Sequence, residues 1–222
     1  MTIGLVVPAY NAASTLPRLL AEAGQFVEPR DLLVVDDGST DRTAAVCHAA
    51  GVEIQRHPCN RGKGAALQTG FRWAIQRGYP AVITLDADGQ HDCRDIPRFI
   101  DAAVSEQADL VIGSRMDRPD GMPWARQLSN RLTSRIISWR VGQRIRDSQS
   151  GYRLIRTTVL QTVPLVTSRF QTESELLIKA ALRGYRIRAI PIRSVYVSPA
   201  SAIRPVIDTW RFVILLTRSL AW

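Results

Sequence analysis

The sequence predicts an α/β fold in which a mostly parallel, Rossmann-like sheet carries helices on both faces. Short apolar runs alternate along the chain with amphipathic segments of helical period. The runs are apolar throughout, which is typical of parallel strands that are buried on both faces. With 222 residues and 45% hydrophobic content, the chain can form one large domain of this class.

The first half of the chain contains most of this repeat. We expect strands at residues 3–7, 32–35, 52–56 and 81–85, and helices at residues 15–25, 40–50 and 63–77. Pro8 ends the first strand, and Ser39 or Asp41 caps the second helix. Gly51 and Gly78 follow the second and third helices, because glycine readily adopts the left-handed conformation that ends a helix.

The repeat continues to residue 114 and then changes. The elements expected next are a helix at 95–107, a strand at 110–113, a basic helix at 123–140, a polar stretch at 147–153, a helix at 172–183, an extended segment at 185–197 and an amphipathic helix at 203–222. We therefore expect one domain over residues 1–202, followed by a C-terminal helix over residues 203–222.

Charge is unevenly distributed along the chain. The net charge is +9, and residues 115–156 contain ten arginines against three aspartates. Such a segment attracts polyanions such as nucleic acid, diphosphates or an anionic membrane surface, unless it is simply a solvated basic face. The sequence contains no aromatic RNA-binding motif, so we expect no nucleic-acid partner.

Cysteine content and hydropathy indicate the compartment. The three cysteines lack metal-ligand or redox spacing, which favours reduced thiols in the cytoplasm, and we expect Cys47 to be a buried apolar residue. The chain runs from Met1 directly into the first strand, so we expect no leader peptide. The apolar run at residues 212–216 is far shorter than the roughly 20 residues that span a membrane.

Two carboxylates stand at the end of the strand at residues 81–85. Asp86 and Asp88 are two residues apart, so their side chains point the same way if the extended backbone continues. They would repel each other unless a cation lies between them. Mg²⁺ suits the position, because it typically binds one or two carboxylates together with substrate phosphate oxygens. A solvated loop is the other interpretation of this short pattern.

Polar residues also follow three other predicted strands. They occur at residues 8–11, 36–39 and 113–115. Because the carboxyl ends of parallel strands lie along one edge of a sheet, we expect these residues and Asp86 to line one cleft, where ligands bind in open α/β sheets. Asp36 and Asp37 have a second interpretation, because aspartates in this position also stabilise turns and helix caps.

These motifs together resemble family 2 glycosyltransferases with the GT-A fold, and most closely the dolichol- and polyprenyl-phosphate sugar synthases. The segments that carry the resemblance are Val-Pro-Ala-Tyr-Asn at 7–11, Val-Val-Asp-Asp-Gly-Ser at 34–39, Asn-Arg-Gly-Lys-Gly at 60–64, Asp-Ala-Asp-Gly-Gln-His at 86–91, Gly-Ser-Arg at 113–115 and Asp-Ser-Gln-Ser-Gly-Tyr-Arg at 147–153. The last segment distinguishes the polyprenyl-phosphate branch.

The resemblance implies a role for each site residue. It places the nucleotide-sugar donor on Pro8, Tyr10, Asn11, Asp37, Lys63, Asp86 and Asp88. It places a divalent ion, Mg²⁺ or Mn²⁺, on Asp88 and Gln90. It places the phosphate of a polyprenyl phosphate acceptor on Arg115, Arg126 and Arg131, and it makes Asp86, Arg115 and Arg131 the catalytic group. One departure concerns the donor, because Ala12 stands where this branch often has glutamate.

Acceptor chemistry distinguishes the remaining alternatives. Transfer to a hydroxyl needs a general base, and Glu173, Glu175 and His91 are the candidates. Transfer to a phosphate does not, because its oxygen is already anionic. The arginine-rich segment favours the phosphate acceptor, and the resemblance implies inversion at the sugar carbon and a GDP-mannose or UDP-glucose type of donor. A non-catalytic module that binds nucleotide sugars or nucleic acid is the alternative from another functional class.

The C-terminal segment is predicted to lie on a membrane surface. One side of the expected helix is apolar and includes Trp210 and Ile214, and Arg204, Arg211 and Arg218 flank it. Basic amphipathic helices with tryptophan lie in membrane interfaces. We therefore expect a peripheral protein on the cytoplasmic face of the cell membrane. Packing against the core or in a dimer is the other interpretation.

Overall fold

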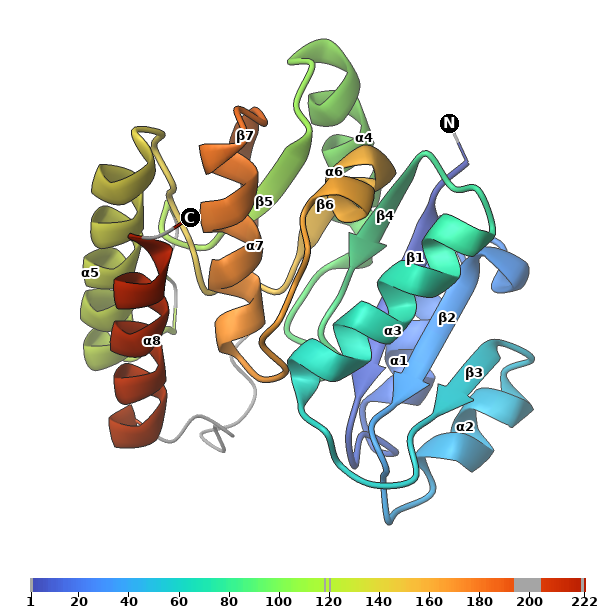
Figure 1. The fold of residues 1–222 in the computed structure, drawn as a ribbon. Helices are drawn as coiled ribbons and strands as arrows, with labels where there is room; N and C mark the ends of the chain where they lie inside the picture. Colours follow the sequence, from blue (N-terminus) through green and yellow to red (C-terminus); the bar gives the residue numbers. More distant parts are fainter. Residues whose placement is uncertain (1, 118, 120, 194–204, 221) are drawn as a thin grey trace.

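The computed structural model describes residues 2–117, 119, 121–193, 205–220 and 222 (Figure 1). Within these residues, seven strands form one sheet in the order β3-β2-β1-β4-β6-β5-β7. The strands are β1 (Gly4–Ala9), β2 (Leu32–Asp36), β3 (Glu53–Arg56), β4 (Ala81–Thr84), β5 (Leu110–Ser114), β6 (Arg153–Arg156) and β7 (Ile187–Pro191).

Helices cover both faces of this sheet. They are α1 (Leu16–Ala23), α2 (Thr43–Ala49), α3 (Lys63–Gln76), α4 (Ile96–Ser105), α5 (Trp124–Val141), α6 (Thr157–Thr162), α7 (Gln171–Leu182) and α8 (Pro205–Ser219), with short 3₁₀ turns η1 (Pro29–Asp31) and η2 (Cys93–Asp95). The predicted α/β class with helices on both faces is therefore confirmed.

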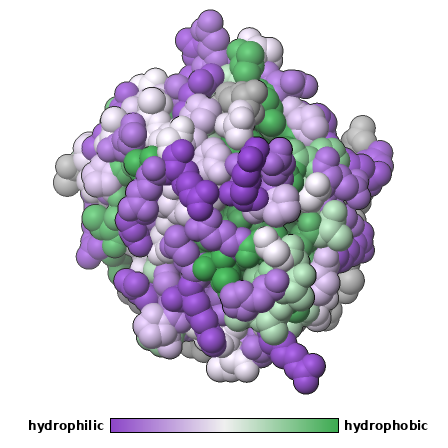
Figure 2. Space-filling view, turned by 90° about the vertical axis from the view of Figure 1, so that its right-hand side faces the viewer, coloured by the Kyte–Doolittle hydropathy of each residue, from purple (hydrophilic) through white to green (hydrophobic). Residues whose placement is uncertain are grey.

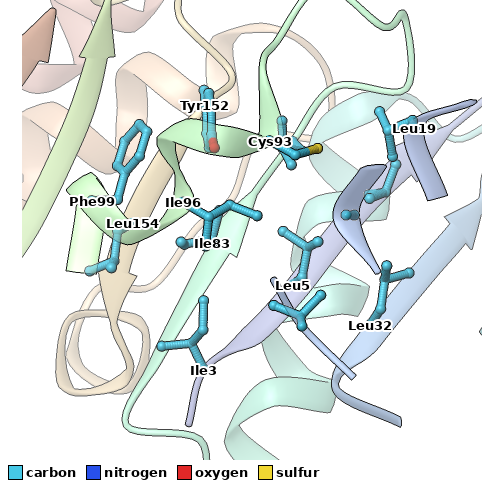
Figure 3. Packing of buried hydrophobic residues seen from close by; sticks show 14 of the residues in the cluster. Ile3, Leu5, Leu19, Leu32, Ile83, Cys93, Ile96, Phe99, Tyr152 and Leu154 are labelled. Atoms are coloured by element: carbon cyan, nitrogen blue, oxygen red, sulfur yellow. The ribbon is translucent and has the colours of Figure 1, made fainter. Parts of the chain in front are cut away.

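Two apolar layers separate the sheet from its helices. On one face, residues such as Leu5 and Ile83 of the strands pack against Leu19 of α1 and Phe99 of α4 (Figure 3). On the other face, α3, α5, α6, α7 and α8 contribute to a second cluster. The strands alternate their side chains between the two layers, which explains why both sides of β1, β2 and β4 are apolar.

Strand β6 was not predicted, and it is the antiparallel member of the sheet. It pairs with β4 on one side and β5 on the other, both antiparallel. Its sequence is Arg-Leu-Ile-Arg, and Arg153 is fully buried while Arg156 bonds to backbone oxygens of Ala103 and Ala108. Because arginine is rarely buried, the segment does not look like a core strand. Helix α6, which follows directly, was also missed.

The expected edge of the sheet is present. Strands β1, β2 and β4 pair in parallel, and β5 runs in the same direction because β6 is antiparallel to both β4 and β5. The carboxyl ends of these four strands therefore lie on one side. Helix α3 approaches β1 so closely that a Cβ atom on Gly70 would overlap Val6. This contact fixes the beginning of α3, and with it Lys63, relative to the strand ends.

The predicted C-terminal helix is α8, which begins at Pro205 in the structure. Leu215 is buried against the second apolar layer, and Arg140 of α5 donates to the backbone oxygen of Ser219. The other side of the helix, including Trp210, is exposed. Among the described residues, no helix is long and apolar enough to cross a membrane. Ile203 and Arg204 lie outside the described residues. Packing on the domain is thus present, and membrane contact stays a prediction.

Candidate functional site

The loops after β1 and β2 are tied together at the edge of the sheet. Asn11 donates its backbone N–H to the Ser39 hydroxyl at 2.9 Å, and its side-chain oxygen accepts from the Thr40 N–H at 2.9 Å. Asn11 has a φ of 51°, a conformation that asparagine tolerates better than most residues. Next to it, Tyr10 is exposed, and Pro8 is buried beneath. The predicted donor-binding residues of β1 thus form a rigid loop with an accessible ring.

Asp36 and Asp37 both support backbone turns. Asp36 accepts from the Ser39 N–H at 2.8 Å. Asp37 accepts from the N–H groups of Arg61 and Gly62 at 3.0 and 2.7 Å. The turn interpretation is therefore correct for both residues. A role for Asp37 in holding the nucleoside stays a prediction. The contacts of Asp37 show that it shapes the loop before α3.

His57 completes this support and was not selected from the sequence. Its Nδ1 lies 2.7 Å from Asp37 Oδ1, and its Nε2 lies 3.0 Å from the Thr69 hydroxyl. The ring is buried, and it links the loop to α3. A lone histidine before a Pro-Cys pair gives no sequence signal of this role, because the partner Asp37 is 20 residues away.

Lys63 lies between two carboxylates at the centre of the edge. Its Nζ is 2.6 Å from Asp86 Oδ1 and 3.1 Å from Glu173 Oε1. Burial alone would lower the pKa of Lys63, but Asp86 and Glu173 outweigh it and raise the pKa above its usual value. Burial likewise opposes ionisation of Asp86, and Lys63 and His91 reverse this effect, so the pKa of Asp86 is lowered. Lys63 and Asp86 are therefore both charged at neutral pH.

The segment at residues 147–153 buttresses this cluster. A Cβ atom on Gly151 would overlap the Asp86 carboxylate, so only glycine permits their close approach. Arg153 donates to the backbone oxygens of Ser148, Ser150 and Glu173 at 2.7 to 2.8 Å. The motif that distinguishes the polyprenyl-phosphate branch thus positions both Asp86 and the beginning of α7.

Arg115 is held by the first residue of the same motif. Its side chain makes two bonds to Asp147, at 2.9 and 3.0 Å, and its backbone N–H makes a third at 3.0 Å. Asn130 of α5 also donates to Asp147, at 2.6 Å. Burial alone would raise the pKa of Asp147, but Arg115 and Asn130 outweigh it and hold the pKa below its usual value. The ion pair therefore fixes the direction in which Arg115 extends from β5.

The other predicted acceptor arginines belong to α5. Arg131 is exposed and follows Asn130 directly, and Arg126 is half-buried one turn earlier. The structure brings Arg131 to the outside of the helix that carries Asn130. The phosphate-binding roles of both arginines stay predictions.

The predicted metal ligands suit a divalent ion whose coordination shell is completed by oxygens of the substrate. Asp88 is exposed at the strand-end edge, and its Oδ1 accepts from the Gln90 N–H at 3.0 Å. Within the described chain, no three His, Cys, Asp or Glu side chains group as metal ligands. Mg²⁺ commonly takes only one or two protein oxygens and completes its shell with water and phosphate. A carboxylate and an amide oxygen in this position meet that requirement.

The three candidates for a general base differ in their surroundings. Glu175 accepts from the N–H groups of Val166 and Thr167 and contacts Lys179 Nζ at 2.5 Å, so it holds the loop that precedes α7. Glu173 is paired with Lys63. The Nε2 of His91 is 3.9 Å from Asp86 Oδ2.

Comparison with known proteins gives consistent results. The family model described as glycosyl transferase family 2 matches residues 5–163. Undecaprenyl-phosphate mannosyltransferase from Micrococcus luteus is 32% identical over 208 residues, which cover 86% of this chain and 83% of that protein. Polyprenol monophosphomannose synthase from Mycolicibacterium smegmatis is 32% identical over 201 residues, which cover 85% of this chain and 75% of that protein.

A solved structure supports the fold. Glucosyl-3-phosphoglycerate synthase from Mycobacterium tuberculosis, in complex with Mn²⁺, UDP and phosphoglyceric acid, superposes with a TM-score of 0.72. The alignment covers 98% of this chain and 78% of that one, at 22% identity. At this identity the likeness concerns the fold alone, and the GT-A architecture expected from the sequence is confirmed.

Proposed function

We propose that this chain, which belongs to glycosyl transferase family 2, transfers a sugar from a nucleotide-sugar donor to the phosphate of a polyprenyl phosphate. Its membership in the family makes it a glycosyltransferase, which excludes the non-catalytic module. The relatives named as polyprenyl-phosphate mannosyltransferases align over most of both lengths and support the acceptor class. A GDP-mannose or UDP-glucose type of donor remains part of the proposal.

The observation that best supports a phosphate acceptor is the pairing of the carboxylates at this edge of the sheet. Asp86 and Glu173 are both paired with Lys63, and Glu175 is committed to the loop at residues 166–167. Burial alone would raise the pKa of each, but Lys63 and His91 lower the pKa of Asp86, and Lys179 and Thr167 lower the pKa of Glu175, so both carboxylates are weak bases. An acceptor whose oxygen is already anionic requires no proton transfer, and it fits a site in which Arg115 is held ready by Asp147.

The reaction follows from this arrangement. An oxygen of the acceptor phosphate attacks the anomeric carbon of the donor sugar, a new carbon–oxygen bond forms, and the bond to the nucleoside diphosphate breaks. Attack from the side opposite the leaving group inverts the anomeric configuration. Tyr10 and the loop shaped by Asp37 hold the nucleoside, Lys63 and Asp86 face the diphosphate and sugar, and Arg115, Arg126 and Arg131 hold the acceptor phosphate.

A divalent ion on Asp88 and Gln90, Mg²⁺ or Mn²⁺, would neutralise the charge that develops on the leaving diphosphate. The similar fold of glucosyl-3-phosphoglycerate synthase, solved in complex with Mn²⁺ and UDP, supports this part of the proposal. The reaction would take place at the cytoplasmic face of the membrane, where the lipid phosphate of the acceptor is accessible to a peripheral protein.

The test is direct. Purified protein is incubated with radiolabelled GDP-mannose or UDP-glucose and detergent-dispersed undecaprenyl phosphate, with and without Mn²⁺. We expect label in the lipid fraction only when the divalent ion is present. Label in the lipid fraction in EDTA would contradict the metal assignment, and failure of every donor with the phosphate acceptor would contradict the acceptor.

A further inference from the structure

We infer that the outer face of α5, together with the exposed side of α8, is a surface that docks on an anionic lipid bilayer. This inference specifies the membrane contact of the proposed function. It rests on the exposure, charge and position of residues on α5 and α8, among which Arg131 also belongs to the proposed acceptor site.

The outer face of α5 exposes large apolar side chains. Trp124 is 77% exposed and Trp139 is 85% exposed, and both leucines between them, Leu128 and Leu132, are more than half exposed. At about 100° per residue these four side chains fall within a quarter of the helix circumference, so they form one stripe. Large contiguous apolar patches on a soluble surface commonly mark a binding site.

The charges on α5 favour an anionic partner. The helix contains four arginines and no acidic residue. Arg131 and Arg135 are exposed, and by the same helical spacing Arg135 lies within the apolar stripe and Arg131 at its edge. Arginine side chains can extend from an apolar surface to reach phosphate groups, and each contributes to attraction toward an anionic leaflet. A protein partner with a purely apolar face would leave these charges desolvated, whereas lipid phosphates would match them.

Helix α8 extends this surface. The two helices lie side by side at the β7 end of the sheet, and Arg140 of α5 bonds to the last turn of α8 (Figure 1). On α8, Trp210 and Ile214 are exposed, whereas Leu215 packs inward. By contrast, the side of the molecule nearest α2 and β3 shows only small, separate hydrophobic patches among hydrophilic residues (Figure 2). Tryptophan and arginine together are typical of helices that lie in a membrane interface.

The inner face of α5 connects this surface to the site. Asn130 and Ser134 are buried, and they bond to Asp147 and Ser148 of the motif that positions Arg115. A helix is about 10 Å in diameter with its side chains. Docking of the outer face would therefore bring the lipid phosphates within one helix width of Arg115. The same helix would determine how deeply the protein inserts into the bilayer. It would also position Arg115, which is proposed to bind the acceptor phosphate.

Vesicle binding tests the surface without any enzymatic reaction. The full chain is mixed with phosphatidylcholine vesicles that contain or lack phosphatidylglycerol, and the bound fraction is measured by flotation. We expect binding that requires phosphatidylglycerol and weakens as salt rises, because screening acts over about 8 Å at physiological ionic strength. Tryptophan quenching by brominated lipids should accompany binding.

Matched variants locate the surface. Arg131→Gln with Arg135→Gln should weaken partitioning about 30-fold, and Arg42→Gln on the far side should not. Leu132→Ser with Trp139→Ser should weaken it by roughly tenfold or more, whereas Val104→Ser on α4 should leave it unchanged. Val104 is a suitable control because it and Leu132 are each 58% exposed. Circular dichroism of every variant verifies folding.

Two results would overturn the inference. One is vesicle binding that is absent, or equal in all variants. The other is a stable dimer in solution that the α5 substitutions dissociate without any lipid binding, which would make this face a contact between two copies. Activity toward detergent-dispersed acceptor is measured separately, so a failed docking surface and a failed acceptor assignment give different results.

Discussion

Carboxylates accept backbone N–H groups on both sides of the site, but on the β5–β6 side they also pair with largely buried cations. Asp37 bonds to the backbone of Arg61 and Gly62, with His57 behind it. Asp147 instead pairs with Arg115, and Glu175 with Lys179. The first arrangement builds a fixed cradle from backbone N–H groups, and there Asp36 also pairs with the more exposed Arg56. The second keeps cations in place beside a predicted anionic acceptor, and its stability depends on pH.

The largest expected effect concerns the predicted metal ligand between these two sides. Asp88→Asn should lower turnover by roughly a hundredfold or more, the scale of removing one group that stabilises developing charge. The thermal midpoint should barely change, because Asp88 is exposed and substitutions at such positions rarely alter stability. Turnover and melting are measured on the same preparation. Wild-type turnover in the Asp88→Asn variant would show that Asp88 is not a metal ligand.

Asp147→Asn tests the buried pairing on the β5–β6 side. The change leaves the nearly buried Arg115 without its charged partner and should lower the free energy of unfolding by about 3 kcal/mol at neutral pH. The folded-state pKa of Asp147 lies below the unfolded value of about 3.9. Its contribution is therefore complete above pH 4 and is lost as the pH falls through the folded value.

Urea denaturation at several pH values gives the measurement. The difference between wild type and Asp147→Asn should be constant near neutrality and should shrink in acid. A difference that does not depend on pH would show that Asp147 contributes through packing and neutral hydrogen bonds, and the contrast between the two sides would not hold.

Arg131→Ala addresses the acceptor. Loss of a charge-assisted contact costs about 1.5–3 kcal/mol, which corresponds to a rise in acceptor KM of roughly ten- to a hundredfold. Donor KM should change little, because Lys63 and Asp86 remain intact. Glu173→Gln serves as the companion variant. If Glu173→Gln abolishes transfer while Arg131→Ala retains it, a hydroxyl acceptor with a glutamate base becomes the better assignment.

The smallest effect is expected on the β1–β2 side. His57→Gln removes or lengthens one buried hydrogen bond to Asp37 and should cost about 1 kcal/mol of stability. Because His57 acts only through the loop before α3, donor KM should rise several-fold while kcat at saturating donor stays near wild type. Steady-state kinetics with varied donor separate the two constants, and a loss confined to kcat would exclude a positioning role.

The sequence predicted well what depends on local pattern. Buried strands, the alternation with helices and the shared edge were all readable, because parallel strands that are covered on both faces are continuously apolar. Helix α3 begins at Lys63 as expected. Burial of Cys47 is confirmed as well.

What was missed depends on contacts between distant residues. Strand β6 was not predicted because the burial of Arg153 depends on hydrogen bonds to three backbone oxygens, and the sequence does not reveal these contacts. The pairing of Lys63 with Glu173 spans 110 residues. Glu175 was weighed as a base, yet it holds a loop. A charged residue in a motif therefore indicates a site, and only the fold distinguishes a group that reacts from one that supports.

The most direct test of the central claim compares two acceptors that differ only in their reactive group. Sugar transfer to undecaprenyl phosphate and to undecaprenol is measured side by side with the same labelled donor and Mn²⁺. The site described here predicts a lipid-linked sugar phosphate from the first and no product from the second. Efficient transfer to undecaprenol, with no use of undecaprenyl phosphate, would contradict the account.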